Sequence, residues 1–506
     1  MKFNTKTVEK NRITNYEGAT AYKITPALEL YSSVVTFSLN NTFYEKADDR
    51  ITRLRELIAL NNPEFVAKLA IYAREKMYLR SVPLVLAVEL AKTHKGDDLV
   101  SRLVSRIVKR ADEITELLAY YQAANQRTDV KKLNKLSKQL QKGLAVSFNK
   151  FDEYQFAKYN RDAEIKLRDA LFLVHPKAKD ENQQALFDKI VNDNLDVPYT
   201  WETELSKQGQ SEFANEAEKQ NAFRNKWQEL IDSNKLGYMA LLRNLRNILT
   251  ANVNQDYIKK ITQRIADEKE VQNSKQLPFR FLSAFRELEK VPSPNVQLLL
   301  SALEEAMKIA IQNLKGFDEN TTVLIACDVS GSMMIPISPR SSVQAYDIGL
   351  VLGMLLQYSS KSVMSGIFGD TWKIINLPKD NILSNVQALH RRNGEVGYST
   401  NGYLVIKDVL NRKQKVDKVM IFTDCQLWNS NDSKESISTY WKQYKKEVAP
   451  KAKLYLFDLA GHGQMPLQIR DNDVNLVAGW SDKVFEVMEA IENGETTLSQ
   501  IDKIEF

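Results

Sequence analysis

The sequence T-V-L-I-A-C-D-V-S-G-S-M, from Thr322 to Met333, joins an unbroken apolar run to three oxygen-bearing side chains. An apolar run of this length is typical of a strand buried on both faces, as in a parallel sheet. Asp328, Ser330 and Ser332 then fall in the loop at the carboxyl end of that strand, where open α/β sheets bind ligands. One carboxylate and two hydroxyls are hard oxygen donors, which suit Mg²⁺, Mn²⁺ or Ca²⁺ rather than zinc. A serine-rich turn that caps the next helix is the alternative, and the buried strand before the pattern makes it the weaker one.

The residues around this stretch alternate between apolar runs and amphipathic segments. Together they predict an α/β domain with a doubly wound, Rossmann-like parallel sheet. The expected strands are 363–368, 416–423, 454–459 and 474–478, and the expected helices are 343–358, 402–410, 434–448 and 483–491. The run K-V-M-I-F-T-D ends in Asp424, and the segment G-Y-S-T-N-G places Thr400 in a loop before a helix. Asp424, like Asp328, is therefore expected at the carboxyl end of a strand.

The first 320 residues predict almost nothing but helix, and no strand is expected before residue 321. Asn62, Pro63 and Glu64 form a helix-start signal of a capping residue, a first-turn proline and a first-turn acid. Many short helices without another core element indicate an α-solenoid of the HEAT type. The expected amphipathic helices include 97–109, 111–124, 130–148, 163–174, 212–232, 235–250 and 296–314.

Length and composition fit a multidomain globular protein. The chain has 506 residues, enough to bury more than one core. No apolar run approaches the length of a membrane span, and the first residues lack the apolar core of a secretory signal, so a cytoplasmic protein is expected. The two cysteines, Cys327 and Cys425, do not make a disulfide framework and indicate a reducing compartment. Buried spectator thiols are favoured over a redox pair.

Positive charge is concentrated in the helical part of the chain. Residues 321–506 carry 20 Lys and Arg against 21 Asp and Glu, whereas residues 1–320 carry 50 against 43, an excess of +7. Residues 95–150 hold 12 basic and 6 acidic residues, including a helical stripe of Lys131, Lys132, Lys135, Lys138 and Lys142. This part of the chain is therefore a candidate for a polyanion partner. On charge alone, a solvated helix face is the favoured explanation.

The pattern D-x-S-x-S resembles the metal-ion-dependent adhesion site of von Willebrand factor A domains. The resemblance implies that a threonine and an aspartate complete the site, and it assigns these roles to Thr400 and Asp424. Ser399 is an alternative to Thr400, because the family usually has glycine just before the threonine. The implied ion is Mg²⁺ first, with Mn²⁺ or Ca²⁺ as alternatives. With at most two carboxylates, the ion keeps residual positive charge and an open position for a carboxylate or phosphate of a partner.

Several segments, in their order and spacing, resemble the Ro/TROVE family across nearly the whole chain. They are residues 21–45, the run G-L-A-V-S-F-N-K-F-D-E-Y-Q-F-A-K-Y-N-R from Gly143 to Arg161, the following K-L-R-D-A-L-F-L-V-H-P-K, and, in the second domain, F-T-D-C-Q and A-G-W-S-D-K-V-F-E-V-M. The resemblance implies a TROVE helical domain over residues 1–318 and a von Willebrand factor A domain over residues 319–506.

The family resemblance also implies a function and a set of RNA contacts. It implies a monomeric ring of HEAT-like helices that the A domain helps to close. Small noncoding Y-like RNAs are expected on the basic outer surface, and single-stranded ends of misfolded RNAs in the central hole. An exoribonuclease is a further implied partner, in RNA quality control or nuclease scaffolding. Lys158, Arg161 and His175 match, or lie beside, family positions that contact RNA.

Each RNA assignment has a structural alternative. His175 precedes Pro176 and could simply cap a helix end, while Lys158 and Arg161 could be solvent-exposed helix residues. The aromatic run from Phe148 to Tyr159 could stack bases, and core packing is the favoured explanation.

No catalytic arrangement is predicted. The chain has no Gly-rich phosphate loop, no H-E-x-x-H and no nucleophile elbow, and no third group is placed as a general base beside Asp328 and Asp424. The sequence therefore favours a noncatalytic RNA-binding protein. The alternative is a divalent-metal-dependent adaptor whose helical domain docks proteins.

Overall fold

The computed structural model describes residues 11–37, 46–125, 136–160, 164–339, 341–429, 435–468 and 473–506. Arg161 and the lysines at 131, 132 and 135 lie outside these ranges. The chain forms two compact units. Unit 1 comprises Met1–Leu57, Ala266–Lys290 and Gln297–Ser499, and unit 2 comprises Ile58–Ile265, Val291–Val296 and Gln500–Phe506. These units describe packing, and the domain boundary at residues 318/319 and the closure of a ring stay predictions.

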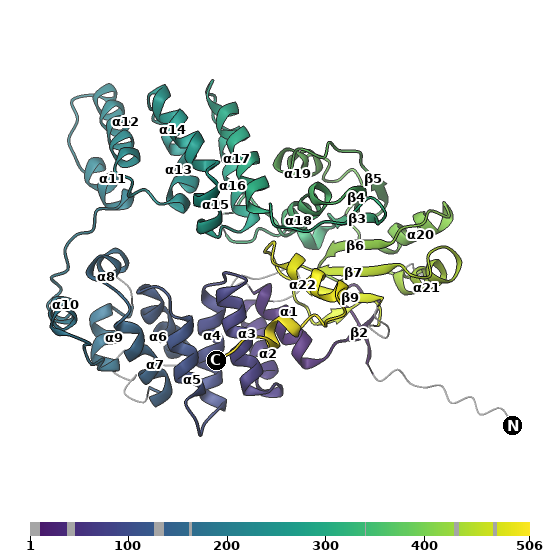
Figure 1. Cartoon of the computed structure of the whole chain (residues 1–506), viewed down its shortest axis with the longest axis horizontal. Coiled ribbons are helices and arrows are strands. Elements are labelled where there is room, and N and C mark those ends of the chain that lie inside the picture. Colours follow the sequence, from purple (N-terminus) through teal and green to yellow (C-terminus); the bar gives the residue numbers. More distant parts are fainter. Residues whose placement is uncertain are drawn as a thin grey trace. The chain divides into compact units, whose positions relative to one another are not determined.

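Unit 1 is built on a six-stranded sheet in the order β5-β4-β3-β6-β7-β9. The strands are parallel except for the antiparallel edge strand β5 (Figure 1). Their bounds are β3 Thr322–Asp328, β4 Ser362–Phe368, β5 Trp372–Ile374, β6 Lys418–Thr423, β7 Lys453–Asp458 and β9 Val474–Ala478. The predicted α/β sheet is therefore confirmed, with each expected strand in its place.

The strand order reverses at β3, because the chain continues to β4 on one side and later adds β6 on the other. Such a reversal leaves a crevice at the carboxyl ends of the two central strands. The register pairs Cys327 with Phe422, so Asp328 and Thr423 end adjacent strands. The central strands are buried along their length, and Phe422 stacks on Phe457 with ring centroids 4.4 Å apart.

Helices flank this sheet and extend unit 1. Helix α18 packs against β3, β4 and β6, α22 packs against β9, and α20 packs against α21. The helices of this part are α15 Glu268–Ser274, α16 Pro278–Glu289, α17 Val296–Ala310, α18 Ala345–Ser359, α19 Leu383–His390, α20 Tyr403–Asn411, α21 Ile437–Glu447 and α22 Val484–Glu492, with a 3₁₀ helix at Gly331–Met334. The short helix α23, Ser499–Asp502, starts at the last residue of unit 1 and lies mostly in unit 2. Arg286 of α16 is buried and forms a two-pronged ion pair with the buried Asp347 of α18, with both N–O distances 2.6 Å.

The amino-terminal segment belongs to unit 1, and it corrects one expectation. Two strands precede residue 321, β1 (Arg12–Thr14) and β2 (Thr20–Lys23), which form a hairpin that pairs with β8 (Gln464–Met465). These strands are three and four residues long, too short for a period-2 pattern to be read from sequence. Helix α1 (Pro26–Val35) follows and packs against β9. Its Tyr31 hydroxyl donates to the Ala478 carbonyl at 3.0 Å.

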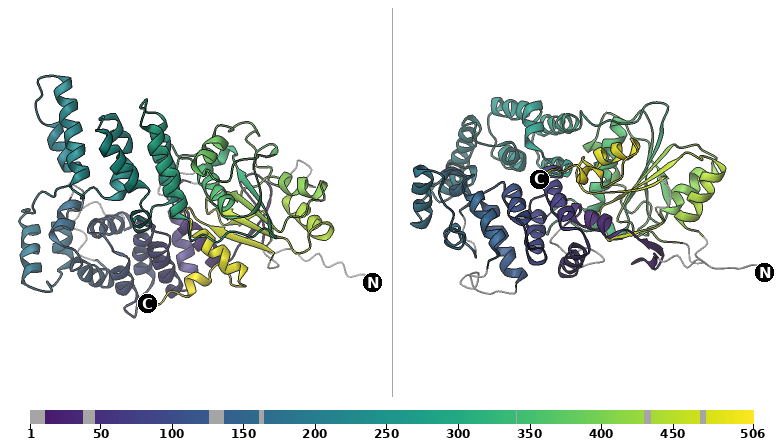
Figure 2. Two further views of the ribbon diagram at one scale, coloured as in Figure 1. Left: turned by 45° about the horizontal axis from the view of Figure 1, so that its top comes forward. Right: turned by 60° about the horizontal axis from the view of Figure 1, so that its bottom comes forward.

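Helices are the regular structure of unit 2 in its described residues, as predicted. Helix α3 begins at the expected signal, because Asn62 accepts the Glu64 N–H at 2.8 Å and Pro63 takes the first helical position. Successive helices stack on one another: α3 contacts α4 and α5, α5 contacts α7, and α12 contacts α11 and α14 (Figure 2). The α5–α7 contact requires Gly143, where a Cβ would lie 2.6 Å from the Val104 Cβ. This stacking of short helices is that of a HEAT-like solenoid.

The remaining helices lie in unit 2, with α2 running across its boundary. They are α2 Ala47–Leu60, α3 Pro63–Glu75, α4 Ser81–Thr93, α5 Leu99–Ile107, α6 Asp112–Ala124, α7 Lys138–Phe148, α8 Glu153–Tyr159, α9 Leu167–Val174, α10 Glu181–Val191, α11 Trp201–Gly209, α12 Glu216–Asp232, α13 Tyr238–Thr250 and α14 Gln255–Ile265. Among the described residues, no helix has both the length and the apolar character to cross a membrane.

Candidate metal centre and nucleic-acid interface

The D-x-S-x-S loop is held at the switch point of the sheet by its own hydrogen bonds. Asp328 accepts the Ser330 N–H at 3.0 Å through Oδ1 and the Thr423 hydroxyl at 2.7 Å through Oδ2. The hydroxyls of Ser330 and Ser332 lie 3.3 Å apart. All these side chains are buried. The local geometry thus gathers one carboxylate and three hydroxyls at the ends of β3 and β6.

Asp424 brings a second buried carboxylate to this cluster. Its Oδ1 accepts the Gln426 N–H at 2.9 Å, and its carboxylate also accepts the Ser332 hydroxyl. Burial, together with the charge of Asp328, raises the pKa of Asp424. Burial likewise raises the pKa of Asp328, against the hydrogen bonds from Ser330 and Thr423. The two buried carboxylates repel each other when both are ionised. A bound cation would stabilise their ionised forms.

The Thr400 loop touches both neighbouring loops of the cluster. The Tyr398 carbonyl accepts the Gly331 N–H at 2.9 Å, and the Thr400 carbonyl accepts the Trp428 N–H at 3.0 Å. Thr400 is buried, and its Oγ1 has no hydrogen-bond partner among the described residues. A buried hydroxyl without a partner is costly unless something else satisfies it. The Thr400 loop therefore contacts both carboxylate-bearing loops and holds a buried hydroxyl that has no partner among the described residues.

Ser399 has a different environment from Thr400. Its side chain is exposed and its N–H donates to Asp370 at 2.7 Å, with a further hydrogen bond from its hydroxyl. The hydrogen bonds from Ser399 and Tyr398 lower the pKa of Asp370. Gly397 permits this arrangement, because its φ is +77° and a Cβ there would lie 2.2 Å from the Asp370 carboxyl carbon. The geometry thus favours Thr400 over Ser399 as the donor.

The donor set fits a hard divalent cation. Asp328, Ser330, Ser332, Thr400 and Asp424 together offer carboxylate and hydroxyl oxygens, the chemistry that Mg²⁺ and Ca²⁺ prefer. Within the described ranges, no group of three or more His, Cys, Asp and Glu side chains is placed to hold a metal. A cation at this site would therefore depend on the hydroxyls and on the buried oxygen of Thr400.

Several residues that support this site were not identified from sequence. Asp370 follows the apolar run 363–368 and could have been found, because it repeats the strand-then-aspartate pattern of Asp328 and Asp424. Thr423 directly precedes Asp424, and its hydroxyl bonds to Asp328. No sequence signal indicates Asn15, whose side-chain amide donates to the Leu427 carbonyl at 2.8 Å.

The amino-terminal hairpin lies against the loop that carries Asp424. The Tyr16 N–H donates to the side-chain oxygen of Gln426 at 3.0 Å, two residues beyond Asp424. Helix α1 also reaches the end of β7, where the Ser32 hydroxyl donates to Asp458 at 2.5 Å. Burial raises the pKa of Asp458. The edge of the sheet is thus built from segments more than 400 residues apart in the chain.

Both cysteines are buried free thiols on the strands or loops beside the cluster. Burial raises the pKa of Cys327 and of Cys425, so neither is a reactive thiolate at neutral pH.

Lys158, the first of the candidate RNA contacts, is exposed on α8. Its ammonium lies 5.7 Å from the ring centroids of both Tyr154 and Tyr159, and Arg110 stacks on Tyr159 at 4.4 Å. Tyr154 is itself 45% exposed. This group of cations and aromatic rings is the Lys158 patch. Its chemistry suits a nucleic-acid backbone with an unstacked base.

His175 lies at the end of α9 in the left-handed conformation, with φ of 50°. Its N–H donates to the Leu171 carbonyl at 2.9 Å, so its backbone caps the helix while its imidazole stays exposed. The capping alternative therefore describes the backbone and leaves the ring available. No hydrogen bond or ring contact joins His175 to Lys158 among the described residues. Arg161 lies outside those residues.

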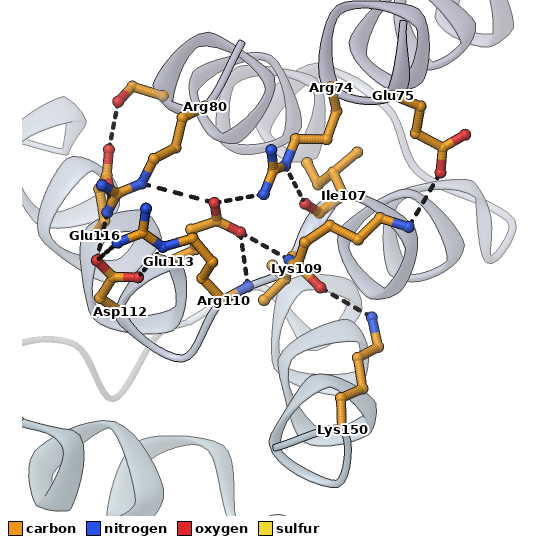
Figure 3. A network of polar contacts seen from close by, with 12 residues as sticks. Arg74, Glu75, Arg80, Ile107, Lys109, Arg110, Asp112, Glu113, Glu116 and Lys150 are labelled. Atoms are coloured by element: carbon orange, nitrogen blue, oxygen red, sulfur yellow. Dashed lines mark hydrogen bonds and ion pairs between the residues drawn. The ribbon is translucent and has the colours of Figure 1, made fainter. Parts of the chain in front are cut away.

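Much of the basic excess in unit 2 is held in ion pairs within the fold (Figure 3). The buried Glu113 forms an ion pair with the Arg74 guanidinium at 2.7 Å, and its carboxylate also accepts the backbone N–H groups of Lys109 at 2.7 Å and Arg110 at 3.1 Å. Arg80 bridges Asp112 and Glu116 with N–O distances of 2.6 and 2.8 Å.

Further basic side chains of this region are bound within the fold, by carboxylates or by backbone carbonyls. Arg106 and Lys109 both pair with Glu75. Lys150 donates to the Ser105 and Val108 carbonyls. These cations stabilise the helix packing, so the raw charge count overstates the surface available to a polyanion.

The aromatic run divides between core and surface. Phe148, Phe151 and Phe156 are buried and pack together, with ring centroids of 5.8 to 5.9 Å. The prediction of core packing is confirmed for these three residues. Only Tyr154 and Tyr159 of this run remain beside Lys158 at the surface.

Comparisons with known proteins agree with this architecture. A family model described as the TROVE domain matches residues 28–226 and 193–336, and one described as the Ro60 vWA domain matches residues 322–491. The solved crystal structure of Deinococcus radiodurans RO (RSR) protein has a TM-score of 0.60 and 18% identity, covering 93% of this chain and 100% of that chain. At that identity the likeness shows a shared fold.

Two curated relatives are named Telomerase protein component 1. The protein from Rattus norvegicus is 26% identical over 358 residues, covering 55% of this chain and 13% of the relative. The protein from Mus musculus is 26% identical over 312 residues, covering 46% and 11%. This chain thus spans only about an eighth of the length of these relatives. Because the TROVE model matches more than half of the residues and is followed by the Ro60-type A domain, the chain belongs to the Ro/TROVE family, whose members are known as RNA-binding proteins.

Proposed function

We propose that this chain is a noncatalytic RNA-binding protein of the cytoplasm, in which unit 2 contacts RNA and the α/β part of unit 1 binds a divalent cation. The proposed RNAs are small noncoding Y-like RNAs on a basic outer surface and misfolded RNAs with single-stranded ends. The proposed role is RNA quality control or the scaffolding of an exoribonuclease by a monomeric ring. Family membership supports RNA binding, and family members are not known as enzymes. The name of the curated relatives adds support for a ribonucleoprotein setting.

The observation that carries the RNA assignment is the Lys158 patch. Its cation is exposed and free of ion pairs among the described residues, unlike Arg74, Arg80 and Arg106. A free cation can release counterions from a phosphate, and neighbouring tyrosine rings can stack an unpaired base. Such contacts distinguish little between base sequences, which suits a protein that binds many RNAs.

The test is a triple substitution of Lys158, Arg161 and His175 to Ala. Affinity for an RNA with a single-stranded end should fall, and the slope of log affinity against log salt should flatten by roughly 1 to 2, at about 0.7 per phosphate contact. Mobility shifts over a salt series measure both quantities. Lys259→Ala serves as the control, because Lys259 is an exposed lysine of the same unit that pairs with Asp256. An unchanged slope and affinity in the triple variant would place the RNA surface elsewhere.

We further propose that Asp328, Ser330, Ser332, Thr400 and Asp424 bind the cation, with Mg²⁺ as the first expectation and Mn²⁺ or Ca²⁺ as alternatives. The unpartnered Thr400 hydroxyl and the two desolvated carboxylates support this assignment. Calorimetric titration with Mg²⁺ and Mn²⁺ tests it, because Asp328→Ala should abolish binding. An unchanged affinity in that variant would show that the assignment is wrong.

A metal-dependent adaptor is the second candidate, supported by the charge of the donor set. The site offers at most two carboxylates to a divalent ion. The ion would keep an open coordination position, which an acidic group of a partner could fill. The ultraviolet spectrum of the purified full chain separates the two candidates. Copurified nucleic acid that high salt removes favours the RNA-binding protein. A clean protein spectrum, with a protein partner retained only in Mg²⁺, favours the adaptor.

A further inference from the structure

Unit 2 contains a pocket whose lining residues, between Leu205 and Asn252, do not belong to the Lys158 patch. Helices α11, α12 and α13 and the turn after α13 line it, and its volume is about 410 Å³. This volume falls within the range of roughly 300 to 1,000 Å³ that is common for small-molecule sites. Neither the metal centre nor the candidate RNA contacts use any of its lining residues.

One side of the pocket is apolar and aromatic. Phe223 and Trp227 of α12 and Leu205 of α11 contribute to its lining. Trp227 is only 3% exposed and stacks on Trp201 with ring centroids 6.5 Å apart and planes 18° apart. The Trp227 part of this wall is therefore fixed by packing before any ligand binds, and a preformed wall reduces the entropic cost of binding.

The charged groups of the pocket are mostly cations. Arg224, Arg246 and Lys219 line it together with a single acid, Glu216. Lys219 pairs with that acid at 3.6 Å, and both side chains are exposed. Arg224 is the distinctive member, because its Nε is buried and has no hydrogen-bond partner among the described residues. A buried guanidinium N–H without a partner is a donor that a phosphate oxygen would satisfy.

The remaining polar groups of the pocket are mainly amides. Gln220, Asn247 and Asn252 offer both donors and acceptors at its rim. Such side chains suit the edge of a nucleobase, which also presents both kinds of group. A phosphopeptide would use the arginines and would leave the amides and the aromatic wall without a specific role.

We propose that this pocket binds one nucleotide, with the base against Phe223 and the 5′-phosphate on Arg224 and Arg246. Two ligands share this chemistry: a free nucleoside monophosphate and the 5′-phosphorylated end of an RNA. The second source rests on the proposed RNA-binding function.

Calorimetric titration of the full chain with AMP and UMP tests the pocket. Adenosine and inorganic phosphate serve as the partial ligands, and each should bind at least about 10-fold more weakly than AMP, because each lacks one of the two contacts. Arg224→Gln should weaken AMP binding by about 10-fold or more. Phe223→Leu should do the same through the base, and it provides a second test if Arg224→Gln fails to fold.

The matched control is Arg243→Gln. Arg243 lies on α13 one turn before Arg246, is exposed, and does not line the pocket. This variant should bind AMP as the wild type does. Absence of AMP and UMP binding, equal binding of phosphate and AMP, or AMP affinity unchanged in both pocket variants would overturn the proposal.

A second arm distinguishes the two sources of the nucleotide. If RNA ends supply it, a 5′-phosphorylated single-stranded oligonucleotide should bind more tightly than its unphosphorylated form, and AMP should remove the difference. If the free nucleotide is the ligand, AMP binds and the two oligonucleotides do not differ. The triple variant at Lys158, Arg161 and His175 should still bind AMP, so failure of the RNA-binding proposal and failure of the pocket give separate results.

Discussion

Replacing Asp424 with Asn should stabilise the cation-free chain and abolish its stabilisation by Mg²⁺. Asp424 and Asp328 are both buried, and burial raises the pKa of each, with the charge of Asp328 adding to the effect at Asp424. A carboxyl group whose pKa is higher in the folded state binds more protons there than in the unfolded chain. The free energy of unfolding therefore falls as pH rises above about 4, the ordinary carboxyl pKa, until the raised pKa of the folded state is passed.

The magnitude follows from this linkage. Each pKa unit between the folded and unfolded states corresponds to about 1.4 kcal/mol. A pKa raised by about one to two units on folding gives a loss of stability on the order of 1 to 3 kcal/mol at pH 7.5, and Asp424→Asn should recover much of it. The Asn oxygen can still accept the Gln426 N–H. Mg²⁺ at ten times its Kd should stabilise the wild type by about 1.4 kcal/mol and the variant by almost nothing.

Urea denaturation of the full chain at pH 5 and pH 7.5, with EDTA or with Mg²⁺, measures these quantities. In EDTA the wild type should lose stability between the two pH values more steeply than Asp424→Asn. Asp380→Asn is the matched control, because Asp380 is exposed in the same unit and has no partner among the described residues. The reasoning is refuted if Asp424→Asn is less stable than the wild type in EDTA at pH 7.5, or if Mg²⁺ stabilises both proteins equally.

Three further perturbations test the surroundings of the site. Asp370→Ala removes the acceptor of two N–H groups in the adjacent loop, so calorimetry should show Mg²⁺ affinity reduced by about 10-fold, and an unchanged affinity would remove Asp370 from the support of the site. Arg286→Met removes the guanidinium partner of the buried Asp347 and should lower the free energy of unfolding by about 3 to 5 kcal/mol in urea, whereas a loss below 1 kcal/mol would contradict the buried ion pair. A chain ending near residue 318 loses Asp458, the partner of Ser32, and the sheet on which α1 packs. It should therefore show a reduced helical signal in circular dichroism and rapid proteolysis of the amino-terminal segment. A protease-resistant amino-terminal segment would show that this segment folds without the α/β part.

The fold class could be predicted well from sequence, because its signals are local. The strand Thr322–Asp328 is an unbroken apolar run, and α3 begins at a side-chain cap formed by Asn62 and Pro63. The hairpin of β1 and β2 could not be predicted. Its strands are three and four residues long, and it is stabilised by pairing with β8, more than 400 residues away.

Part of the candidate site was also predicted from local sequence signals. Asp328, Ser330 and Ser332 are neighbours in the sequence, so their convergence follows from one loop. The role of Asp370 depends on its contact with a loop 28 and 29 residues further along the chain. The basic residues show where composition misleads. A charge count includes Arg74 in the surface charge, whereas the fold pairs Arg74 with the buried Glu113.

The sequence by itself therefore determined the two kinds of architecture, the position of the oxygen-rich loop after β3, and the excess of positive charge in the helical part. Hydrophobic period, helix caps and short motifs act over a few residues, and the chain carries them whatever it later packs against. Only the tertiary structure decided that the Thr400 hydroxyl is buried without a partner among the described residues, in a loop that contacts both carboxylate-bearing loops, and which of the described cations remain free for a ligand. Those properties arise from desolvation and from contacts between segments far apart in the chain, and both exist only once the chain has folded.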